Sequence, residues 1–301
     1  MLQSSPAQIR RAYLALAAIC IIWGTTYTAI KFAVRDFPPF LLVSIRQLAA
    51  GVLLLAWVFA QQKVAWPDKK YLLRQSITGL ATITGGNGCI TWAMQYVSSG
   101  LSAVIGSLTP VMVVLINLAW RGSEKINALI ICGVLLGFGG LGIVFSDGWR
   151  DFANPDYRWG LAGCLASCFT WSLGTVMAKR WNDTRLPLMF NAGIQITAGG
   201  LGAVVLGLLF DPTWQIRHSP EGWASVAYLA VIGSALAFTL YTFALKHLST
   251  TVSSLYTYIN PVVAILLGWL LLGEHLSWME LGGMAVTMVG VYLVNLGNRR
   301  D

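Results

Sequence analysis

The chain has 301 residues, of which 56% are hydrophobic and only 11% carry a charge. Soluble domains contain about 45–50% apolar and about 25% charged residues, so a soluble protein of this size could not bury so much apolar surface. The composition excludes a soluble globular domain and indicates that a lipid bilayer surrounds the chain. The net charge of +8 does not indicate nucleic-acid binding, because the basic residues are spread over short segments between long apolar runs.

Ten apolar segments are each long enough to cross about 30 Å of hydrocarbon as a helix. They cover residues 13–33, 39–60, 75–96, 100–120, 126–146, 159–178, 188–210, 223–245, 251–272 and 279–296. The break with loop character lies at residues 147–158, which are rich in Asp, Asn and Pro. The sequence therefore predicts an all-α integral membrane protein, with a first domain at residues 1–146, a periplasmic linker at 147–158 and a second domain at 159–301.

The basic residues predict the orientation of the chain, since Lys and Arg favour the cytoplasmic side of a membrane. With the N-terminus inside, fourteen of the 20 Lys and Arg residues fall in inner segments and five in outer ones, and Arg46 lies within a span. We therefore expect both termini in the cytoplasm of a bacterium, with the chain in its inner membrane. A cleavable signal is not expected, because the first apolar segment follows Arg10 and Arg11 and is a full span long.

The two halves of the chain contain the same helix pattern. Residues 98–122 and 249–273 match at an offset of 151, which places Pro110 on Pro261. The first and sixth helices match over WGTTYTAIK and WSLGTVMAK at an offset of 148. Because each half has five spans, the second copy crosses the membrane in the opposite direction. The sequence predicts two inverted five-helix repeats around a central cavity, an arrangement that suits alternating access.

This ordered set of features resembles the drug/metabolite transporter superfamily, EamA type. The matching features are WGTTY in the first helix, the Pro-Pro start of the second helix with Arg46 inside it, the twin proline helices, and the pair Gly273 and Glu274. The first copy departs from the last of these by one inserted residue, Ser123, before Glu124. The resemblance covers nearly the whole chain. It implies a ten-helix, basket-like carrier of small metabolites, with the fifth helix of each half packed outside the cavity.

Arg46 is the one charged residue well inside a predicted span, and its counterpart in the second half is Ile194. A charged side chain in hydrocarbon costs on the order of several kcal/mol, so Arg46 must face the interior of the bundle or a wet cavity. Two roles remain open for it. The guanidinium could bind a substrate carboxylate, or it could clamp main-chain carbonyls at helix breaks.

Aromatic and polar side chains at helical spacing form stripes that should face protein or water. They could line a cavity for a zwitterion or a planar ligand, or they could join helices and anchor them at the membrane surface. The anchor role is open in particular for Lys31 and Lys179. Together with Arg46, the predicted substrate-binding residues are Trp23, Tyr27, Gln47, Asn87, Thr91, Trp92, Trp171, Gln195, Tyr241, Tyr256 and Asn260.

Pro110 and Pro261 each free a carbonyl one turn upstream, so we expect each to bend its helix, either as a gating or substrate site or as a static kink. No cofactor is expected. The G-x-G-x-x-G match at residues 137–142 lies inside an apolar helix and instead indicates close helix packing through Gly133 and Gly137. No metal is expected, because the five cysteines lack the spacing of metal ligands.

These features predict a secondary transporter that moves small metabolites across the cytoplasmic membrane by alternating access. The leading hypothesis is export of amino acids or related carboxylate-bearing compounds, and the alternative is efflux of amphiphilic drugs or toxicants. A membrane-embedded enzyme fits less well, because His218, His247 and His275 fall in separate loops and no carboxylate pair approaches the core. A homodimer is compatible with the sequence, which does not determine the oligomeric state or the coupling ion.

Overall fold

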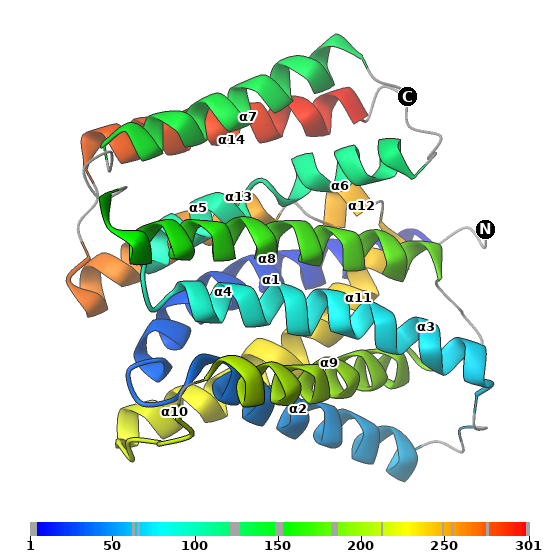
Figure 1. Ribbon diagram of the computed structural model, residues 1–301. Coiled ribbons are helices and arrows are strands. Elements are labelled where there is room, and N and C mark those ends of the chain that lie inside the picture. Colours follow the sequence, from blue (N-terminus) through cyan, green and yellow to red (C-terminus); the bar gives the residue numbers. More distant parts are fainter. Residues whose placement is uncertain are drawn as a thin grey trace.

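The computed structural model describes residues 5–61, 64, 67–120, 127–147, 153–181, 186–211, 213–248, 250–253, 256–274 and 277–298. All regular structure in these residues is helical, and the helices form one bundle (Figure 1). The start of the first helix and the end of the last lie at the same end of this bundle. Residues 148–152 of the predicted linker, and Glu124 of the repeat, lie outside the described residues.

In the first half of the chain, two of the predicted spans are interrupted rather than regular. The third span contains a π-helical segment, η1, and the fourth is broken after Gly106. The elements are α1 (Pro6–Ala33), α2 (Pro39–Gln61), α3 (Lys69–Gly79), η1 (Leu80–Asn87), α4 (Gly88–Ala93), α5 (Ser99–Gly106), α6 (Thr109–Ala119) and α7 (Ala128–Asp147).

In the second half, the eighth predicted span contains a π-helical segment, η3, and the ninth contains another, η4. The elements are α8 (Pro155–Arg180), α9 (Leu188–Phe210), α10 (Pro220–Tyr228), η3 (Leu229–Leu236), α11 (Ala237–His247), α12 (Thr250–Ser253), α13 (Tyr256–Leu267), η4 (Gly268–Leu272) and α14 (Trp278–Asn298). The segments η3 and η4 are π-helical, like η1.

Six helices in the described residues are long and apolar enough to cross a membrane. They are Pro6–Ala33, Pro39–Gln61, Ser99–Ala119, Pro155–Arg180, Leu188–Phe210 and Pro220–His247. Shorter apolar helices cover Ala128–Ile143, Tyr256–Leu272 and Leu281–Val294. The fold is therefore that of a multi-helix membrane protein.

Polar caps explain where some of these helices begin. Ser5 and Gln8 form a reciprocal cap at the start of α1, each side chain accepting a hydrogen bond from the other residue's amide. The Asp68 carboxylate accepts a hydrogen bond from the Tyr71 amide at 2.7 Å. Because of this cap, α3 begins at Lys69, six residues before the predicted start of the span.

Helices α7 and α14 pack closely along each other and form an outer layer of the bundle (Figure 1). Glycines make the close approach possible. A Cβ on Gly133 would lie 2.5 Å from the Gly290 carbonyl oxygen, and one on Gly140 would lie 2.6 Å from that of Gly283. The predicted small-residue packing of the fifth helix is confirmed.

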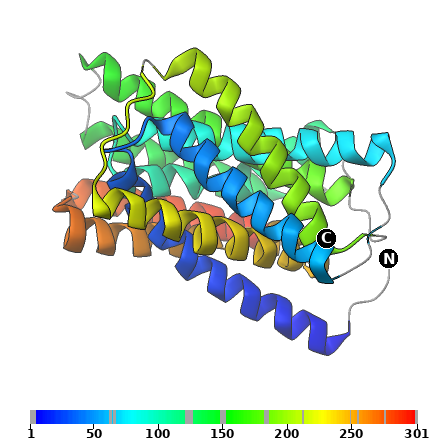
Figure 2. The same cartoon turned by 90° about the horizontal axis from the view of Figure 1, so that it is seen from below.

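The remaining helices exchange partners between the two halves of the chain. Helix α2 packs along α9, α1 packs against α11 and α13, and α8 packs against η1, α4 and α6 (Figure 2). Glycine again permits the approach, since a Cβ on Gly51 would lie 3.1 Å from the Thr197 amide nitrogen. The first helix of each half is therefore held largely by the other half, and the interrupted helices surround an interior cavity.

Candidate binding cavity

The cavity lies between α1, α2, η1, α8, η3 and α13. Its volume is about 90 Å³ for the centres of water-sized spheres, several times the roughly 10–15 Å³ that one water molecule needs. It extends from mid-depth toward the end of the bundle away from the termini. This direction follows because Ile30 and Ile90, which line it, lie one turn from the ends of α1 and α4 at that end.

Arg46 supplies the cavity's positive charge. It is only 2% exposed, and its Nη2 atom donates a hydrogen bond to Asn87 Oδ1 at 2.6 Å. Its Nε atom is buried without a hydrogen-bond partner among the described residues, as is the Oε1 atom of Gln47. No described residue of the lining is acidic. The arrangement therefore contains one charged donor group and one neutral acceptor whose hydrogen-bonding capacity the described residues do not use.

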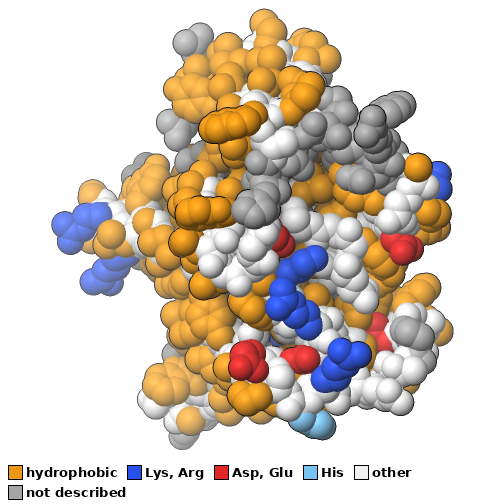
Figure 3. All heavy atoms as spheres, turned by 90° about the vertical axis from the view of Figure 1, so that its left-hand side faces the viewer, with side chains coloured by type: hydrophobic (Ala, Val, Ile, Leu, Met, Phe, Trp, Pro, Cys, Tyr) orange, Lys and Arg blue, Asp and Glu red, His pale blue; other side chains and the backbone are white. Residues whose placement is uncertain are grey.

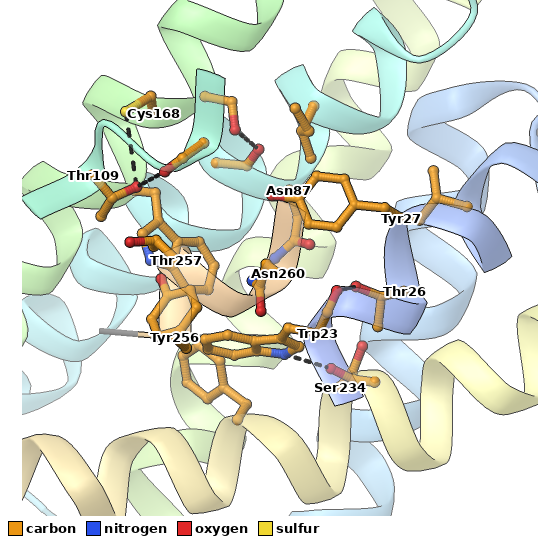
Figure 4. A pocket seen from close by; sticks show the side chains of 18 of the residues that line it. Trp23, Thr26, Tyr27, Asn87, Thr109, Cys168, Ser234, Tyr256, Thr257 and Asn260 are labelled. Carbon is orange, nitrogen blue, oxygen red and sulfur yellow. Dashed lines mark hydrogen bonds between the residues drawn. The ribbon is translucent and has the colours of Figure 1, made fainter. Parts of the chain in front are cut away.

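Aromatic rings close the inner part of the cavity. The ring centroid of Trp23 lies 5.3 Å from that of Trp171, 5.1 Å from that of Tyr241 and 4.7 Å from that of Tyr256. The Trp23 indole nitrogen donates to the Gly233 carbonyl of η3 at 3.1 Å, which fixes the ring. Figure 4 shows Trp23 and Tyr256 side by side, with Tyr27 across the cavity from them. Contacts of this kind are rigid and largely apolar.

The residue before each predicted helix-breaking proline bonds to a carbonyl upstream. Thr109 Oγ1 donates at 2.7 Å to the Gly106 carbonyl, which Pro110 cannot reach with an N–H. The Asn260 side-chain nitrogen, in the orientation that satisfies its neighbours, donates at 3.0 Å to the carbonyl of Tyr256 and at 3.0 Å to that of Cys20. Both side chains reach the cavity (Figure 4).

The two prolines occupy different places. Pro110 lies in the first turn of α6, after a break at residues 107–108, so it begins a helix rather than bending one. Pro261 lies inside α13, and a bend or a gating role at this position stays a prediction. The hydrogen bond of Thr109 therefore closes a helix break, whereas that of Asn260 lies within a continuous helix.

A match to a known protein family identifies the family of this chain. The EamA-like transporter family matches residues 10–146 and, a second time, residues 158–296. The chain belongs to this family. It is accordingly a membrane transporter, and the sequence resemblance to the EamA type is confirmed.

Similar proteins cover nearly the whole chain. The uncharacterized inner membrane transporter YedA of Escherichia coli is 33% identical over 285 residues, which are 94% of this chain and 90% of that protein. An uncharacterized transporter of Synechocystis is 29% identical over 303 residues, covering 95% of this chain and 90% of that one. A crystal structure with 20% sequence identity shares the fold, with a TM-score of 0.67 over 96% of this chain and 98% of the other. The predicted location in the inner membrane is confirmed.

Most of the predicted site residues are brought together by the fold. Eight of them line the cavity: Trp23, Tyr27, Arg46, Gln47, Asn87, Trp171, Tyr256 and Asn260. They come from α1, α2, η1, α8 and α13, so only the tertiary structure makes them neighbours.

Four predicted residues lie outside the cavity lining. Thr91 is fully buried on α4, and Trp92 packs against Tyr96 with ring centroids 5.2 Å apart. Both lie about one helical turn beyond Asn87, where this face of the helix no longer points into the cavity. Tyr241 packs against the rings of Trp23 and Trp171 without lining the cavity itself. Gln195 lines a different pocket.

The remaining lining residues were not predicted. They are mainly small or hydroxyl-bearing: Thr26, Ile30, Gly86, Ile90, Gly106, Thr109, Ser167, Cys168, Gly233, Ser234, Phe238 and Thr257. Helical spacing could have indicated some of them, since Ser167 and Cys168 lie one turn before Trp171 on the same helix face. Ser234 carried no such signal, although its hydroxyl is buried without a partner among the described residues.

Proposed function

We propose that this transporter moves small carboxylate-bearing metabolites, such as amino acids, out of the cell by alternating access. In this proposal ten membrane spans form two inverted five-helix repeats, residues 1–146 and 159–301, joined by the linker at 147–158. The twofold family match and the π-helical segments η1 and η3, which lie in the third and the eighth span, support this arrangement.

The charge distribution supports the proposed orientation, with both termini in the cytoplasm. The end of the bundle with the start of α1 carries eight described basic residues: Arg10, Arg11, Lys69, Lys70, Arg74, Lys179, Arg180 and Lys246. We call it the basic end. At the opposite end, basic and acidic side chains lie among one another (Figure 3). A cytoplasmic basic end agrees with the preference of Lys and Arg for that side.

The proposed substrate class rests on the buried guanidinium of Arg46. Burying a guanidinium beside a neutral amide alone is unfavourable, and an incoming carboxylate would supply the missing countercharge. Arg–carboxylate hydrogen bonds are also roughly twice as strong as neutral ones. Gln47 Oε1, which has no hydrogen-bond partner among the described residues, can accept a hydrogen bond from an ammonium group, so the pair complements a zwitterion.

Metabolite profiling of the medium tests this proposal. Cells that overproduce the wild-type protein would be compared with cells carrying Arg46→Gln and cells carrying an empty vector. The matched control is Arg35→Gln, which removes an exposed arginine from the segment after α1. We expect a small carboxylate to accumulate outside in the wild type and in Arg35→Gln, and to fall at least about tenfold in Arg46→Gln. Equal loss of organic acids and organic cations in Arg46→Gln would instead make Arg46 structural.

Efflux of amphiphilic drugs or toxicants is the second candidate, and the ring cluster around Trp23 favours it. The small volume of the cavity favours compact substrates instead. Growth in the presence of cationic dyes distinguishes the two. If overproduction raises dye tolerance without changing the acids in the medium, the amphiphile hypothesis replaces the carboxylate one.

A further inference from the structure

A second, smaller pocket lies at the basic end of the bundle. Its volume is about 30 Å³, enough for about two water molecules or for a group of the size of a carboxylate. It lies between the N-terminal parts of α3 and α9 and the C-terminal parts of α8 and α11. Its polar lining consists of Gln75, Lys179, Asn191, Gln195, Thr242 and Lys246.

The chemistry of this pocket suits an anion. Two of its residues are lysines, and none of its described residues is acidic. Lys179 Nζ donates to the carbonyls at the end of α11 at 2.6 and 2.8 Å, which leaves one of its three N–H groups for a ligand. Gln195 Nε2 donates to Gln75 Oε1 at 2.6 Å, and both glutamines are at least 96% buried. The hydrogen bond holds the amides in place at the base of the pocket.

A stripe of side chains on α8 connects this pocket to the main cavity. Trp171 lines the cavity, Lys179 lines the pocket, and Thr175 lies midway between them, at successive intervals of four residues. The Thr175 hydroxyl is hydrogen-bonded to the Tyr241 hydroxyl at 2.7 Å. Tyr241 is 2% exposed and packs on Trp23, so this pair separates the two spaces.

Residues at equivalent positions of the proposed repeat line the main cavity and the smaller pocket. Gln47 of α2 lines the main cavity, and Gln195, 148 residues later on α9, lines the pocket. In an inverted repeat, equivalent side chains face opposite ends of the molecule. The pocket is thus placed where the path would open toward the basic end.

We propose that this pocket is a second binding site, which holds the carboxylate of a small metabolite at the basic end before the metabolite passes Tyr241 to reach Arg46. The position on the path rests on the proposed transport function. The preference for anions does not, because it follows from the lining alone.

Thiol labelling tests the anion preference without any transport assay. Ala178, which lines the pocket, is replaced by cysteine in a full-length chain whose five native cysteines are changed to alanine. The purified protein in detergent is reacted with an anionic and a cationic methanethiosulfonate, and each rate is divided by that of a small uncharged one. We expect the anionic reagent to react on the order of tenfold faster than the cationic one. Millimolar sodium acetate should slow the uncharged reagent, and methylammonium should not.

Two variants locate the effect in the pocket. Lys246→Gln should lower the anion-to-cation ratio about threefold and weaken the protection by acetate. Lys70→Gln is the matched control, because it removes an exposed lysine of the basic end that does not line the pocket. The proposal would be overturned by an anion-to-cation rate ratio near one, or by an equal fall of this ratio in both variants. Failure of even the uncharged reagent to react would also overturn it.

Arg46→Gln separates the two hypotheses. It should lower export at least about tenfold and leave the labelling ratio at Ala178→Cys unchanged. If export depends on Arg46 but the ratio is near one, the second site is wrong and the transport proposal stands. If the ratio is high but Arg46→Gln exports normally, the pocket binds anions and the proposed role of Arg46 is wrong.

Discussion

Lys31 and Lys179 make equivalent hydrogen bonds in the two halves of the chain. Lys31 Nζ donates to the main-chain oxygens of Met94 and Val97 at 2.7 and 2.8 Å. Lys179 Nζ donates to the two carbonyls that lie 151 residues later, at 2.6 and 2.8 Å. Each lysine closes the C-terminal end of the third span of its half, where a cation is favourable. The shared contact supports the proposed repeat and gives both lysines a role other than that of membrane-surface anchors.

Lys31→Met and Lys179→Met should each destabilise the protein, because two carbonyls at a helix end lose a charged donor. Hydrogen bonds to charged groups contribute about 1.5–3 kcal/mol each, so a marked fall in the melting temperature in detergent is expected. Lys70→Met serves as the control, since Lys70 is exposed. Melting temperatures within one degree of the control would show that water replaces the lysine without loss.

Asn87→Asp should weaken transport of carboxylates by giving Arg46 an internal partner. The new carboxylate would occupy the position of Asn87 Oδ1, now 2.6 Å from the guanidinium, and would compete with the substrate for its charge. We expect the apparent KM for the exported acid to rise at least about tenfold, with the melting temperature unchanged or higher. Asn87→Ala, which adds no charge, provides the comparison. Unaltered transport in Asn87→Asp would indicate that Arg46 does not meet the substrate.

Gly290→Ala should separate α7 from α14. A Cβ there would lie 2.4 Å from the Gly137 amide nitrogen, and main chain cannot move aside as a flexible side chain can. Overpacking of this kind costs about 1–3 kcal/mol, so the melting temperature should fall. The matched control is Gly139→Ala on α7, where a Cβ would meet nothing within 4 Å. If both variants have the same melting temperature, the glycine contact does not hold this pair of helices together.

The sequence predicted the long helices well because their apolar runs exceed the thickness of the membrane. It did not predict the π-helical segments η1 and η3, which depend on packing rather than on local composition. A glycine in a membrane span indicates that another helix packs closely there, but the sequence does not show which helix it is. A Cβ on Gly174, for example, would lie 3.0 Å from the Thr82 amide nitrogen of η1, and such a contact exists only in the folded bundle.

The fold brings most of the predicted site residues to one cavity and adds lining residues that the sequence did not indicate, while their role in binding stays a prediction. Large polar or aromatic residues such as Trp23 and Arg46 stand out in an apolar span, whereas hydroxyls do not. Many hydroxyls simply bond to their own helix, as Ser172 does to the Cys168 carbonyl at 2.7 Å. Gln195 was predicted because a polar side chain in a span should face protein or water. That criterion is met, but it does not say which interior space the side chain reaches, and Gln195 lines the smaller pocket.

Asp211 connects the end of α9 to the start of α2, which carries Arg46. Its carboxylate accepts hydrogen bonds from the amides of Leu41 at 2.9 Å and Phe40 at 3.4 Å, and it is largely buried. Burial raises the pKa of Asp211 above its ordinary value of 3.8, and the two amides oppose this effect less strongly. The folded protein therefore holds this proton more tightly than the unfolded chain does.

Asp211→Asn should become more stabilising, relative to wild type, as the pH rises. Because the folded pKa is raised, the contribution of protonated Asp211 to stability is complete below the unfolded value of 3.8. It is lost as the pH rises through the folded value, whereas Asn does not titrate. Asp211→Ala separates the charge from the cap, since losing the cap costs about 0.5–2 kcal/mol at every pH. Melting curves of the three proteins from pH 4 to pH 8 provide the test. A wild type that gains stability over Asp211→Asn as the pH rises would mean that the amides of α2 outweigh burial at this carboxylate.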